Sequence, residues 1–527
     1  MVDYINEQLI RASKISRRGL VAGAMATGLA SRVWAGTDAN TPVKGGHLRA
    51  GMNDANTSDS LDPGTFLGTH VISVSRAARD SLLEIGPDNT LQPALAESWE
   101  ASSDAKSWRF KLRKGVEFSD GKSLTAEDVI NSLNVHRGSG SQSGAVSLFQ
   151  SVSDVRKDGP DTVVVELSAP NAIFPYVLTD MHVCVMPTKD GKADVLSPIG
   201  TGCYKITEYV PGVRANLERN PNSWQSGKCG FFDSAELIVL LDDAARQNAL
   251  ISGNVDVISR PPLKTAKMLT AAPGLRLVDV PSNLIFAHSM FCDVAPFSDK
   301  NFRLALKHAL PRQEFLDKVL YGFGHIGNDN PIGPLMPSFD PSIAVNNFDL
   351  DKARFYMKQA GMEGGVSVDY SAADTAYTGA LDAAVLFQES FAKIGVKMNI
   401  IREPNDGYWT NVWLTKPFCA SYWGSLSTED MILSYAWTSK APWNDAHWSD
   451  PRVDKLVLDA RAQLDPAKRS EIYRDVQAII STEGGHLIPG FGNNVAAAND
   501  KIGTPDKVSG LWEMDGAFFV KRWWMKA

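Results

Sequence analysis

The most unusual chemical feature of this sequence is a concentration of indole side chains between residues 409 and 448. Six of the 13 tryptophans lie in this interval, namely Trp409, Trp413, Trp423, Trp437, Trp443 and Trp448. Small and polar residues separate them without the helical or strand period that would bury them on one face. Aromatic walls remove large areas from water at little entropic cost and can face a planar or cationic group. The group is therefore typical of a binding surface, although a single tryptophan is more often a core residue.

Residues that could carry catalysis do not form a recognisable pattern. The sequence has no G-x-S-x-G and no H-E-x-x-H motif, and its nine histidines lack paired ligand spacing. We therefore predict that the protein is not an enzyme and carries no cofactor or metal. An exported hydrolase stays a distant alternative. His70, His288 and His447 could approach a cleft and hold a metal complex or haem, but isolated histidines are more often surface or core groups.

The five cysteines, Cys184, Cys203, Cys229, Cys292 and Cys419, show no C-x-x-C spacing. Neither a zinc ribbon nor a redox motif is indicated, and an odd count leaves at least one free thiol. Cys203 and Cys229 flank a strand-rich segment. Their pairing and two separate buried thiols are equally compatible with the sequence.

Charge excludes two classes of partner. The chain has 527 residues and a formal net charge of -7, while residues 1–35 contain five basic and two acidic residues, so the remainder carries a charge of -10. An acidic body without a basic stripe argues against nucleic acid and against an anionic membrane surface. The length and the 44% hydrophobic content predict a globular protein of two or three domains.

The basic N-terminus has the features of an export signal. Arg17 and Arg18 form a twin-arginine pair, an apolar run from Leu20 to Ala30 follows, and Val33-Trp34-Ala35 is a small-x-Ala cleavage pattern. The run is too short to span a membrane. The sequence therefore predicts a Tat signal peptide over 1–35 and a mature protein in the periplasm.

Strand and helix patterns alternate along the rest of the chain. Trp108, Phe110 and Leu112 alternate with basic residues as in a half-buried strand, and Thr125 can cap the helix that follows. The further predicted strands are 163–167, 237–241 and 396–401, and the further predicted helices are 242–251, 301–310, 311–320, 349–361, 380–395 and 465–480. In the helix 380–395 the predicted buried face is Leu381, Ala384, Val385, Gln388 and Phe391. This alternation predicts an α/β fold with mixed sheets.

Several segments together carry a resemblance to a known family. These are SLDPGTF (60–66), LQPALAESWE (91–100), WRFKLRKGVEFSDGKSLTAEDV (108–129), PIGTGCYKITEYVPGVRANLERNPNSW (198–224), ALISGNVDV (249–257), FRLALKHALPRQEFLDKVLYGFG (302–324) and DLDKARFYMKQAG (349–361). Their order resembles that of the extracytoplasmic solute-binding proteins of family 5, the dipeptide and oligopeptide type that serves ABC importers. The resemblance covers essentially the whole mature chain.

The resemblance implies a two-lobed periplasmic-binding-protein fold of type II, with mixed sheets, a hinge between the lobes and an extra subdomain inserted in lobe I. Carried onto this sequence, lobe I comprises 44–75, 196–282 and 485–527, the inserted subdomain is 76–195, and lobe II is 283–484. Two crossovers, near Pro281 to Leu284 and Gly484 to Ile488, would form the hinge. Closure would bury one solute and present a new surface to the permease subunits at the inner membrane. We expect the protein to act as a monomer.

The resemblance also places the tryptophan-rich region at the interlobe cleft. The predicted ligand-binding residues from lobe II are Trp423, Tyr435, Trp437, Trp443 and Asn444. Those from lobe I are Phe66 and Thr69, just after the LDP motif, and Trp512.

One departure from the family pattern bears on the ligand. Peptide-binding relatives carry an aspartate three residues after the tryptophan that matches Trp423, and it pairs with the α-amino group of the peptide. Here that residue is Leu426, which cannot neutralise a buried ammonium. Glu429 or Asp430 could substitute if the loop shifts. The predicted solute is thus a peptide or a peptide-like small molecule, and the alternatives are an opine-like conjugate, a metal complex or haem.

The export signal gives the first testable prediction. Intact-mass measurement of the exported protein is expected to show a chain that begins at Gly36, because Ala35 ends the cleavage pattern. An exported chain that still contains residues 1–35 would contradict this prediction.

Overall fold

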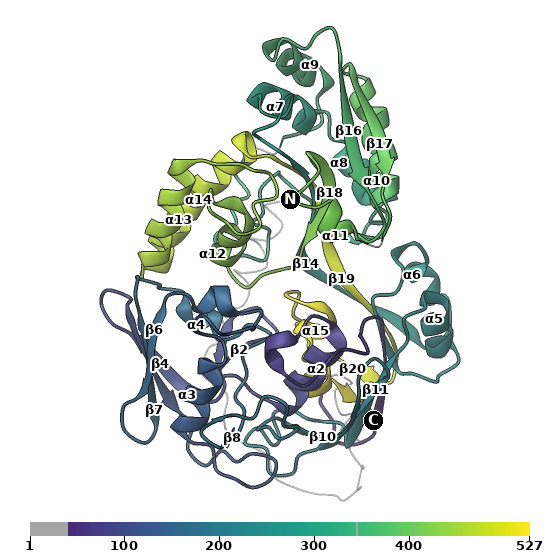
Figure 1. Ribbon diagram of the computed structural model, residues 1–527. Coiled ribbons are helices and arrows are strands. Elements are labelled where there is room, and N and C mark those ends of the chain that lie inside the picture. The colour runs from purple at the N-terminus through teal and green to yellow at the C-terminus, as the bar shows by residue number, and fades with distance from the viewer. Residues whose placement is uncertain (1–40, 344–345, 406, 527) are drawn as a thin grey trace, which may run out of the picture. The chain divides into compact units, whose positions relative to one another are not determined.

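A computed structural model describes residues 41–343, 346–405 and 407–526, and Figure 1 shows its elements. The predicted signal segment lies outside the described residues. The largest sheet of the described part has eleven strands. In spatial order they are β10 (Tyr204–Val210), β11 (Arg214–Arg219), β12 (Ser234–Val239), β1 (His47–Met52), β13 (Val257–Ser259), β19 (His486–Asn499), β14 (Leu275–Met290), β18 (Phe418–Trp423), β16 (Val366–Ala372) and β17 (Val396–Arg402), with β15 (Gly324–Ile326) on β19.

The two longest strands, β14 and β19, hold this sheet together. The first half of β14 pairs antiparallel with the end of β19, from Leu275 opposite Asn499 to Val280 opposite Asn494. After an irregularity between Val280 and Leu284, the second half of β14 pairs with β18 as well as with β19. The irregularity coincides with the first predicted crossover. In β19, the residues opposite this irregularity are Gly492 to Asn494. They lie C-terminal to the second predicted crossover, at Gly484 to Ile488.

A separate antiparallel sheet lies within the range predicted for the inserted subdomain. It consists of β4 (Ala96–Ala101), β5 (Ser107–Leu112), β7 (Thr162–Leu167) and β6 (Val152–Lys157). Trp108, Phe110 and Leu112 of β5 are buried while Arg109 and Lys111 are exposed, as their alternation predicted. These side chains belong to a hydrophobic cluster distinct from those of the main sheet. The domain boundaries themselves stay a prediction.

Two-residue and three-residue strands form three smaller pairs, β2 (Leu83–Ile85) with β3 (Leu91–Pro93), β8 (Thr188–Lys189) with β9 (Lys192–Ala193), and β20 (Ile502–Gly503) with β21 (Trp524–Met525). The α-helices are α2 (Thr69–Ala78), α3 (Ala126–Asn134), α4 (Phe174–Val177), α5 (Asp243–Ile251), α6 (Leu263–Leu269), α7 (Lys300–His308), α8 (Arg312–Lys318), α9 (Leu350–Gln359), α10 (Ala380–Ala392), α11 (Tyr408–Asn411), α12 (Glu429–Ile432), α13 (Pro451–Ala462), α14 (Pro466–Glu483), α15 (Glu513–Gly516) and α16 (Phe519–Arg522). Among the described residues, no helix is both long and apolar enough to cross a bilayer.

Local capping signals predicted several helix starts correctly. Thr125 and Asp128 form a reciprocal capping box at the start of α3. The side chains of Asp242 and Asp465 accept hydrogen bonds from the first turns of α5 and α14. The capping residues thus fix where these helices begin in the sequence.

The predicted buried face of the helix at 380–395 was partly wrong. Val385 is exposed, and the fully buried positions include Ala380, Ala383, Phe387 and Phe391. The buried face is rotated about the axis of α10 relative to the predicted face. The reason is that α10 packs Phe387 and Phe391 into the same core as Tyr370 and Phe418 of the sheet. An alanine-rich helix presents little size contrast, so its sequence specifies the rotation weakly.

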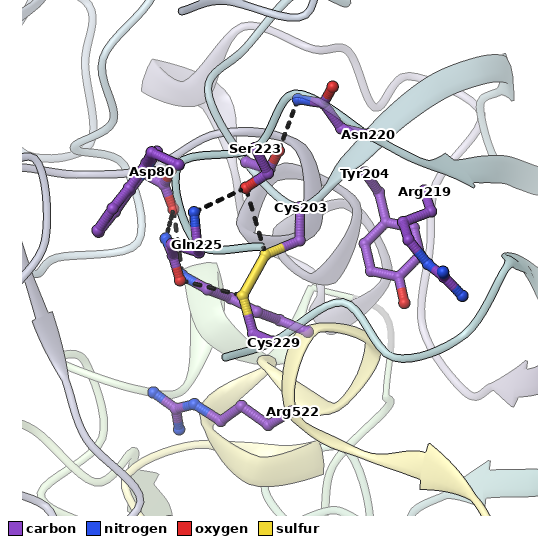
Figure 2. The surroundings of a disulfide bond; sticks show 12 residues. Asp80, Cys203, Tyr204, Arg219, Asn220, Ser223, Gln225, Cys229 and Arg522 are labelled. Atoms are coloured by element: carbon purple, nitrogen blue, oxygen red, sulfur yellow. Dashed lines mark hydrogen bonds and ion pairs between the residues drawn. A yellow bond between two sulfur atoms is a disulfide. The ribbon is translucent and has the colours of Figure 1, made fainter. Parts of the chain in front are cut away.

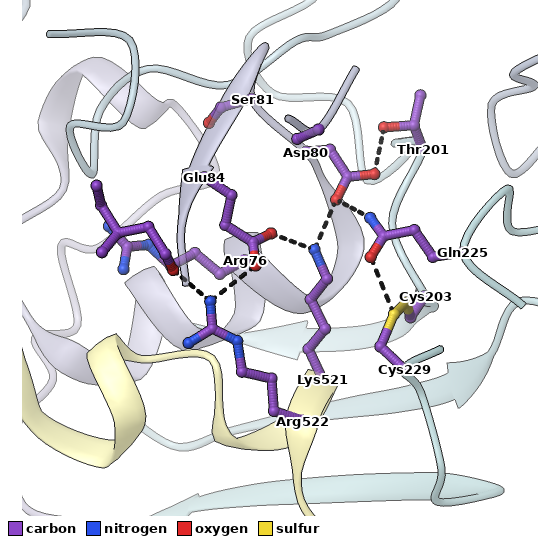
Figure 3. Close-up of polar contacts among 12 residues, drawn as sticks. Arg76, Asp80, Ser81, Glu84, Thr201, Cys203, Gln225, Cys229, Lys521 and Arg522 are labelled. Atoms are coloured by element: carbon purple, nitrogen blue, oxygen red, sulfur yellow. Dashed lines mark hydrogen bonds and ion pairs between the residues drawn. A yellow bond between two sulfur atoms is a disulfide. The ribbon is translucent and has the colours of Figure 1, made fainter. Parts of the chain in front are cut away.

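A network of charged side chains ties the C-terminal helix α16 to the segment from α2 to β2 (Figure 3). Lys521 lies between two carboxylates, 3.1 Å from Asp80 and 2.5 Å from Glu84. Arg522 donates to Glu84 at 2.7 Å and to Asp515 at 3.3 Å. Although burial opposes its ionisation, Lys521 and Arg522 lower the pKa of Glu84 to about 2. The network therefore joins segments that lie more than 430 residues apart in the sequence.

A disulfide bond joins Cys203 to Cys229 next to this network (Figure 2). Gln225 lies beside it and donates to the carboxylate of Asp80 at 3.0 Å. Cys184, Cys292 and Cys419 are free thiols. Of the two alternatives left open by the sequence, the structure has the paired one. Closing a loop of this length lowers the conformational entropy of the unfolded chain. This stabilises the folded state by about 3 kcal/mol.

The Glu84 network predicts a specific acid sensitivity. Because its pKa is about 2 when folded and 4.5 in the absence of partners, Glu84 contributes stability above pH 4.5 that is lost as the pH falls toward 2. Glu84→Gln should lower the free energy of unfolding by about 3 kcal/mol at pH 7 and flatten this part of the pH profile. Urea denaturation at pH 7 and pH 3.5 measures both effects.

Glu100→Gln is the matched control, because Glu100 is exposed and forms only a surface pair with Arg109. A Glu84→Gln protein as stable as the control at pH 7 would show that the network does not stabilise the fold.

Candidate functional site

A small cavity is lined by segments that are distant in the sequence. One side consists of Ser425, Leu426, Ser427 and Met431, which follow β18. The other side consists of residues from α2, from the end of β2, from 179–181 and from the C-terminal segment, and includes Arg76, Asp180 and Trp512. The cavity measures about 70 Å³, which is room for a few water molecules. Among the described residues, Arg76 and Asp180 are the only charged ones that line it.

The three predicted site residues from lobe I come together beside this cavity, but only Trp512 lines it. Trp512 lines it, and its indole nitrogen donates to the hydroxyl of Thr69 at 3.1 Å. Phe66 is buried in the same hydrophobic cluster, against which Trp512 packs. Thr69 is itself fully buried at the start of α2. Trp512 is therefore the least buried member of this group, while Thr69 and Phe66 hold it in place.

The backbone beside Trp512 adopts a left-handed turn. Met514, Asp515, Gly516 and Ala517 all have φ between 51° and 65°. Three of them are not glycine, and each such residue costs about 1 kcal/mol or more. Burial of Met514 and Ala517, and hydrogen bonds from Ser509 and Arg522 to Asp515, offset this cost. The turn places Gly516 on the cavity wall.

The predicted tryptophan wall forms one continuous aromatic cluster. Trp423 lies at its centre, with ring centroids 6.0 Å from Trp413, 5.6 Å from Trp437 and 6.1 Å from Trp443. Trp423 and Trp437 are buried in a hydrophobic core, and among the described residues neither indole N–H has an acceptor. Neither ring lines the cavity described above. The cluster instead adjoins the segment that does, because Leu426 packs against the core that contains Trp423 and Trp437.

The remaining predicted residues lie on the outer part of the cluster. Trp443 is 44% exposed and packs against Tyr435 at 5.3 Å. Burial and the nearby charge of Asp180 raise the pKa of the Tyr435 phenol, while a hydrogen bond with Ser147 acts in the opposite direction. Asn444 donates to the carbonyl of Trp448 at 2.7 Å. Tyr435 is thus the member of the cluster that approaches the opposite wall of the cavity. Ligand contacts by any of these residues stay a prediction.

Both carboxylates that could have replaced the missing aspartate are already bound within the protein. Glu429 accepts from the backbone N–H of Ser338 at 2.8 Å. Asp430 accepts from Arg461 at 2.9 Å, and burial raises the pKa of its carboxyl group. Leu426 itself lines the cavity. This side of the cavity therefore presents no free negative charge.

The three histidines considered for metal or haem capture each have protein partners. His70 contacts the carbonyl of Leu237, and burial lowers its pKa. His288 contacts the Tyr370 hydroxyl at 2.5 Å, and burial lowers its pKa to about 3. His447 contacts Asp293 at 3.1 Å. No group of three or more potential metal ligands occurs in the part of the chain that was described.

Sequence reasoning missed three residues of the cavity wall, Arg76, Asp180 and Ser425. Arg76 lies in the last turn of α2, whose sequence shows only an ordinary helix. Asp180 follows α4 and pairs with His182 at 2.6 Å. Ser425 lies next to Leu426, and no motif includes it. No local signal identifies these residues, because the cavity exists only after distant segments have packed together.

Comparison with known proteins agrees with this geometry. The model for bacterial extracellular solute-binding proteins, family 5 Middle, matches residues 90–445. The chain belongs to this family. The glutathione-binding protein GsiB of Pectobacterium atrosepticum is 26% identical over 523 residues, which cover 96% of this chain and 97% of that protein.

Two solved structures show the shared fold. DppA of Helicobacter pylori, in complex with the peptide STSA, superimposes with a TM-score of 0.76 at 21% identity, covering 92% of this chain and 99% of DppA. AgaA of A. tumefaciens R10, in complex with agropinic acid, gives a TM-score of 0.75 at 22% identity with the same coverage. The fold is the two-lobed periplasmic-binding-protein fold of type II. The family consists of solute-binding proteins rather than enzymes, and this family 5 protein is the substrate-binding component of an ABC importer.

The aromatic cluster gives a testable distinction between core and surface indoles. Trp423→Ala should lower the free energy of unfolding by about 3 to 5 kcal/mol, because it leaves a cavity in a packed core. Trp443→Ala should cost about 1 kcal/mol, because this ring is partly exposed and loses only aromatic contacts. Urea denaturation of both variants measures the difference. Equal losses would contradict the assignment of Trp443 to the outside of the cluster.

Proposed function

We propose that this protein captures a peptide or peptide-like small solute in the cavity between its lobes and delivers it to the permease of an ABC importer. The observation that carries the proposal is the cavity itself, whose walls come from Ser425 to Met431 on one side and from α2 and Trp512 on the other. Distant segments of a two-lobed family 5 protein meet there. The protein works in the periplasm as a monomer and reaches it by the Tat route.

Binding in this cavity requires movement of its walls. A drug-sized ligand occupies roughly 300 Å³ or more, whereas the cavity measures about 70 Å³. The irregularity between Val280 and Leu284, in the strand shared by both halves of the sheet, is a suitable place for this movement. An open form admits the solute, and closure buries it and selects the form that the permease binds.

The composition of the walls suits a solute with apolar and hydrogen-bonding parts. Ile72, Leu426, Met431 and Trp512 supply apolar surface, and Ser425, Ser427 and Ser509 supply hydroxyl groups. Among these, the buried hydroxyl of Ser425 is a donor without a partner within the described residues. Carbonyl groups of a peptide-like solute would satisfy such donors.

A non-peptide ligand of the opine type is the second candidate, and Leu426 favours it. A carboxylate able to hold a free α-amino group is missing from this side of the cavity, because Glu429 and Asp430 are engaged elsewhere. An unpaired ammonium next to Leu426 would remain partly desolvated at a cost of several kcal/mol. Conjugates without a free α-amino group avoid this cost.

The proposal predicts how binding responds to N-acetylation. Calorimetric titration with a panel of dipeptides and oligopeptides should show that acetylated and free forms bind with affinities within about tenfold of each other. Leu426→Asp should restore a preference for the free amine, because it introduces a counter-charge. Sub-micromolar binding by the wild-type protein that N-acetylation abolishes would show that the α-amino group is recognised by another route.

A further inference from the structure

The two charged residues of the cavity wall differ in how their charges are balanced. The carboxylate of Asp180 accepts hydrogen bonds from Nδ1 of His182 at 2.6 Å and from its backbone N–H at 3.0 Å. Although burial opposes it, this contact raises the pKa of His182. The negative charge of Asp180 is therefore compensated within the protein, and it adds little attraction for a cationic ligand.

Arg76 is balanced differently, because Asp180 and Glu84 attract its charge without forming an ion pair with it. Among the ion pairs of the described residues, none includes Arg76, and the nearby Glu84 is bonded to Lys521 and Arg522 instead (Figure 3). Burial and the neighbouring Arg522 lower the pKa of Arg76 to about 10. The guanidinium is thus still charged at neutral pH. One unpaired positive charge remains on the cavity wall, and an anion would stabilise it.

The protein holds the Arg76 guanidinium at a fixed place without using all of its donors. It donates to the carbonyl of Gly516 in the left-handed turn and to the carbonyl of Thr179 at 3.5 Å. Its carbon lies 4.5 Å from the centroid of the Phe518 ring, a cation–π contact. A guanidinium has five N–H donors, so three are left for a ligand.

Ser425 supplies an independent sign of a missing ligand on the opposite wall. Its side chain lines the cavity, the residue is 7% exposed, and its hydroxyl has no hydrogen-bond partner among the described residues. A buried hydroxyl without a partner costs about 1 kcal/mol or more. The hydroxyl of Ser509, in contrast, is already bonded to Asn89 at 2.7 Å.

We propose that Arg76 and Ser425 bind a carboxylate of the solute, Arg76 through its fork of N–H donors and Ser425 through its hydroxyl group. This inference rests on the proposed function and narrows it to acidic peptide-like solutes. A carboxylate is an anion that a guanidinium can bind through two parallel N–H donors, and the two residues lie on opposite walls. Binding the carboxylate therefore joins the walls and favours the closed form.

The test compares each ligand acid with its amide in wild-type and variant proteins. The probes are N-acetylated dipeptides with a free C-terminal carboxylate and the same compounds as C-terminal amides, titrated by calorimetry. In the wild-type protein, amidation should weaken binding by roughly 30-fold or more, the loss expected for breaking a desolvated charge pair. Arg76→Gln should weaken binding of the acid by a similar factor and leave binding of the amide unchanged.

Three further variants sharpen the comparison. Arg76→Lys should recover part of the affinity for the acid, because the charge returns without the two-pronged donor. Ser425→Ala should weaken binding of the acid by roughly fivefold, the loss of one hydrogen bond. Arg354→Gln is the matched control. This residue is exposed on α9 and pairs with Asp351, and the variant should bind both probes like the wild type.

The outcomes separate this inference from the proposed function. Wild-type protein that binds acids and amides equally well overturns the role of Arg76 and leaves the proposed function standing. Arg76→Gln protein that loses acid and amide binding equally, with a lower Tm, shows that Arg76 only braces the turn at Gly516 and also overturns the inference. Wild-type protein that binds no member of the panel overturns this inference and the peptide form of the proposed function, and favours the opine-type candidate.

Discussion

The pairing of β14 with β19 is the constraint on which the rest of the structure depends. Each strand is long enough to serve both halves of the main sheet. The first part of β14 and the last part of β19 pair beside β13, and the remaining parts pair beside β18. A continuous ladder would make the sheet one stiff body. The irregularity between Val280 and Leu284 interrupts the ladder at the junction. The two halves therefore share strands, and the ladder between these strands is interrupted near the predicted hinge.

The cavity wall inherits its geometry from contacts made elsewhere. Lys521 and Arg522 anchor α16 to Glu84, and this anchor fixes the left-handed turn from Met514 to Ala517. This turn positions the carbonyl of Gly516 to accept a hydrogen bond from Arg76. A strained backbone persists only where the surroundings over-determine it. The buried ion network, which by itself is weak evidence for stability, thus has a second consequence, because it positions the guanidinium on the cavity wall.

The sequence predicted local features well and the cavity poorly, for a physical reason. Helix starts at Thr125 and Asp465 depend on side chains within three residues, so the pattern determines them. The rotation of α10 about its axis depends on the sheet residues that Phe387 and Phe391 contact. The alanines around them differ little in size, so the sequence does not indicate which face is buried. Arg76 lies among ordinary helix residues, and its partner Gly516 is 440 residues away. The family resemblance placed the cleft near the tryptophans, but no spacing rule could place a cation from α2 against it.

The concentration of indoles is explained by what it supports. The segment from Ser425 to Met431 rests on this cluster, because Leu426 packs against the core that contains Trp423 and Trp437. Beneath it, Trp413, Trp423 and Trp437 interlock with centroid separations of 5.6 to 6.0 Å. Large rigid rings have only two side-chain torsions to fix, so a core built from them is stiff at low entropic cost. A loop on such a base keeps the Ser425 hydroxyl and Leu426 in place when the opposite wall moves. The tryptophans can therefore determine selectivity by holding this loop, whether or not a ring touches the solute.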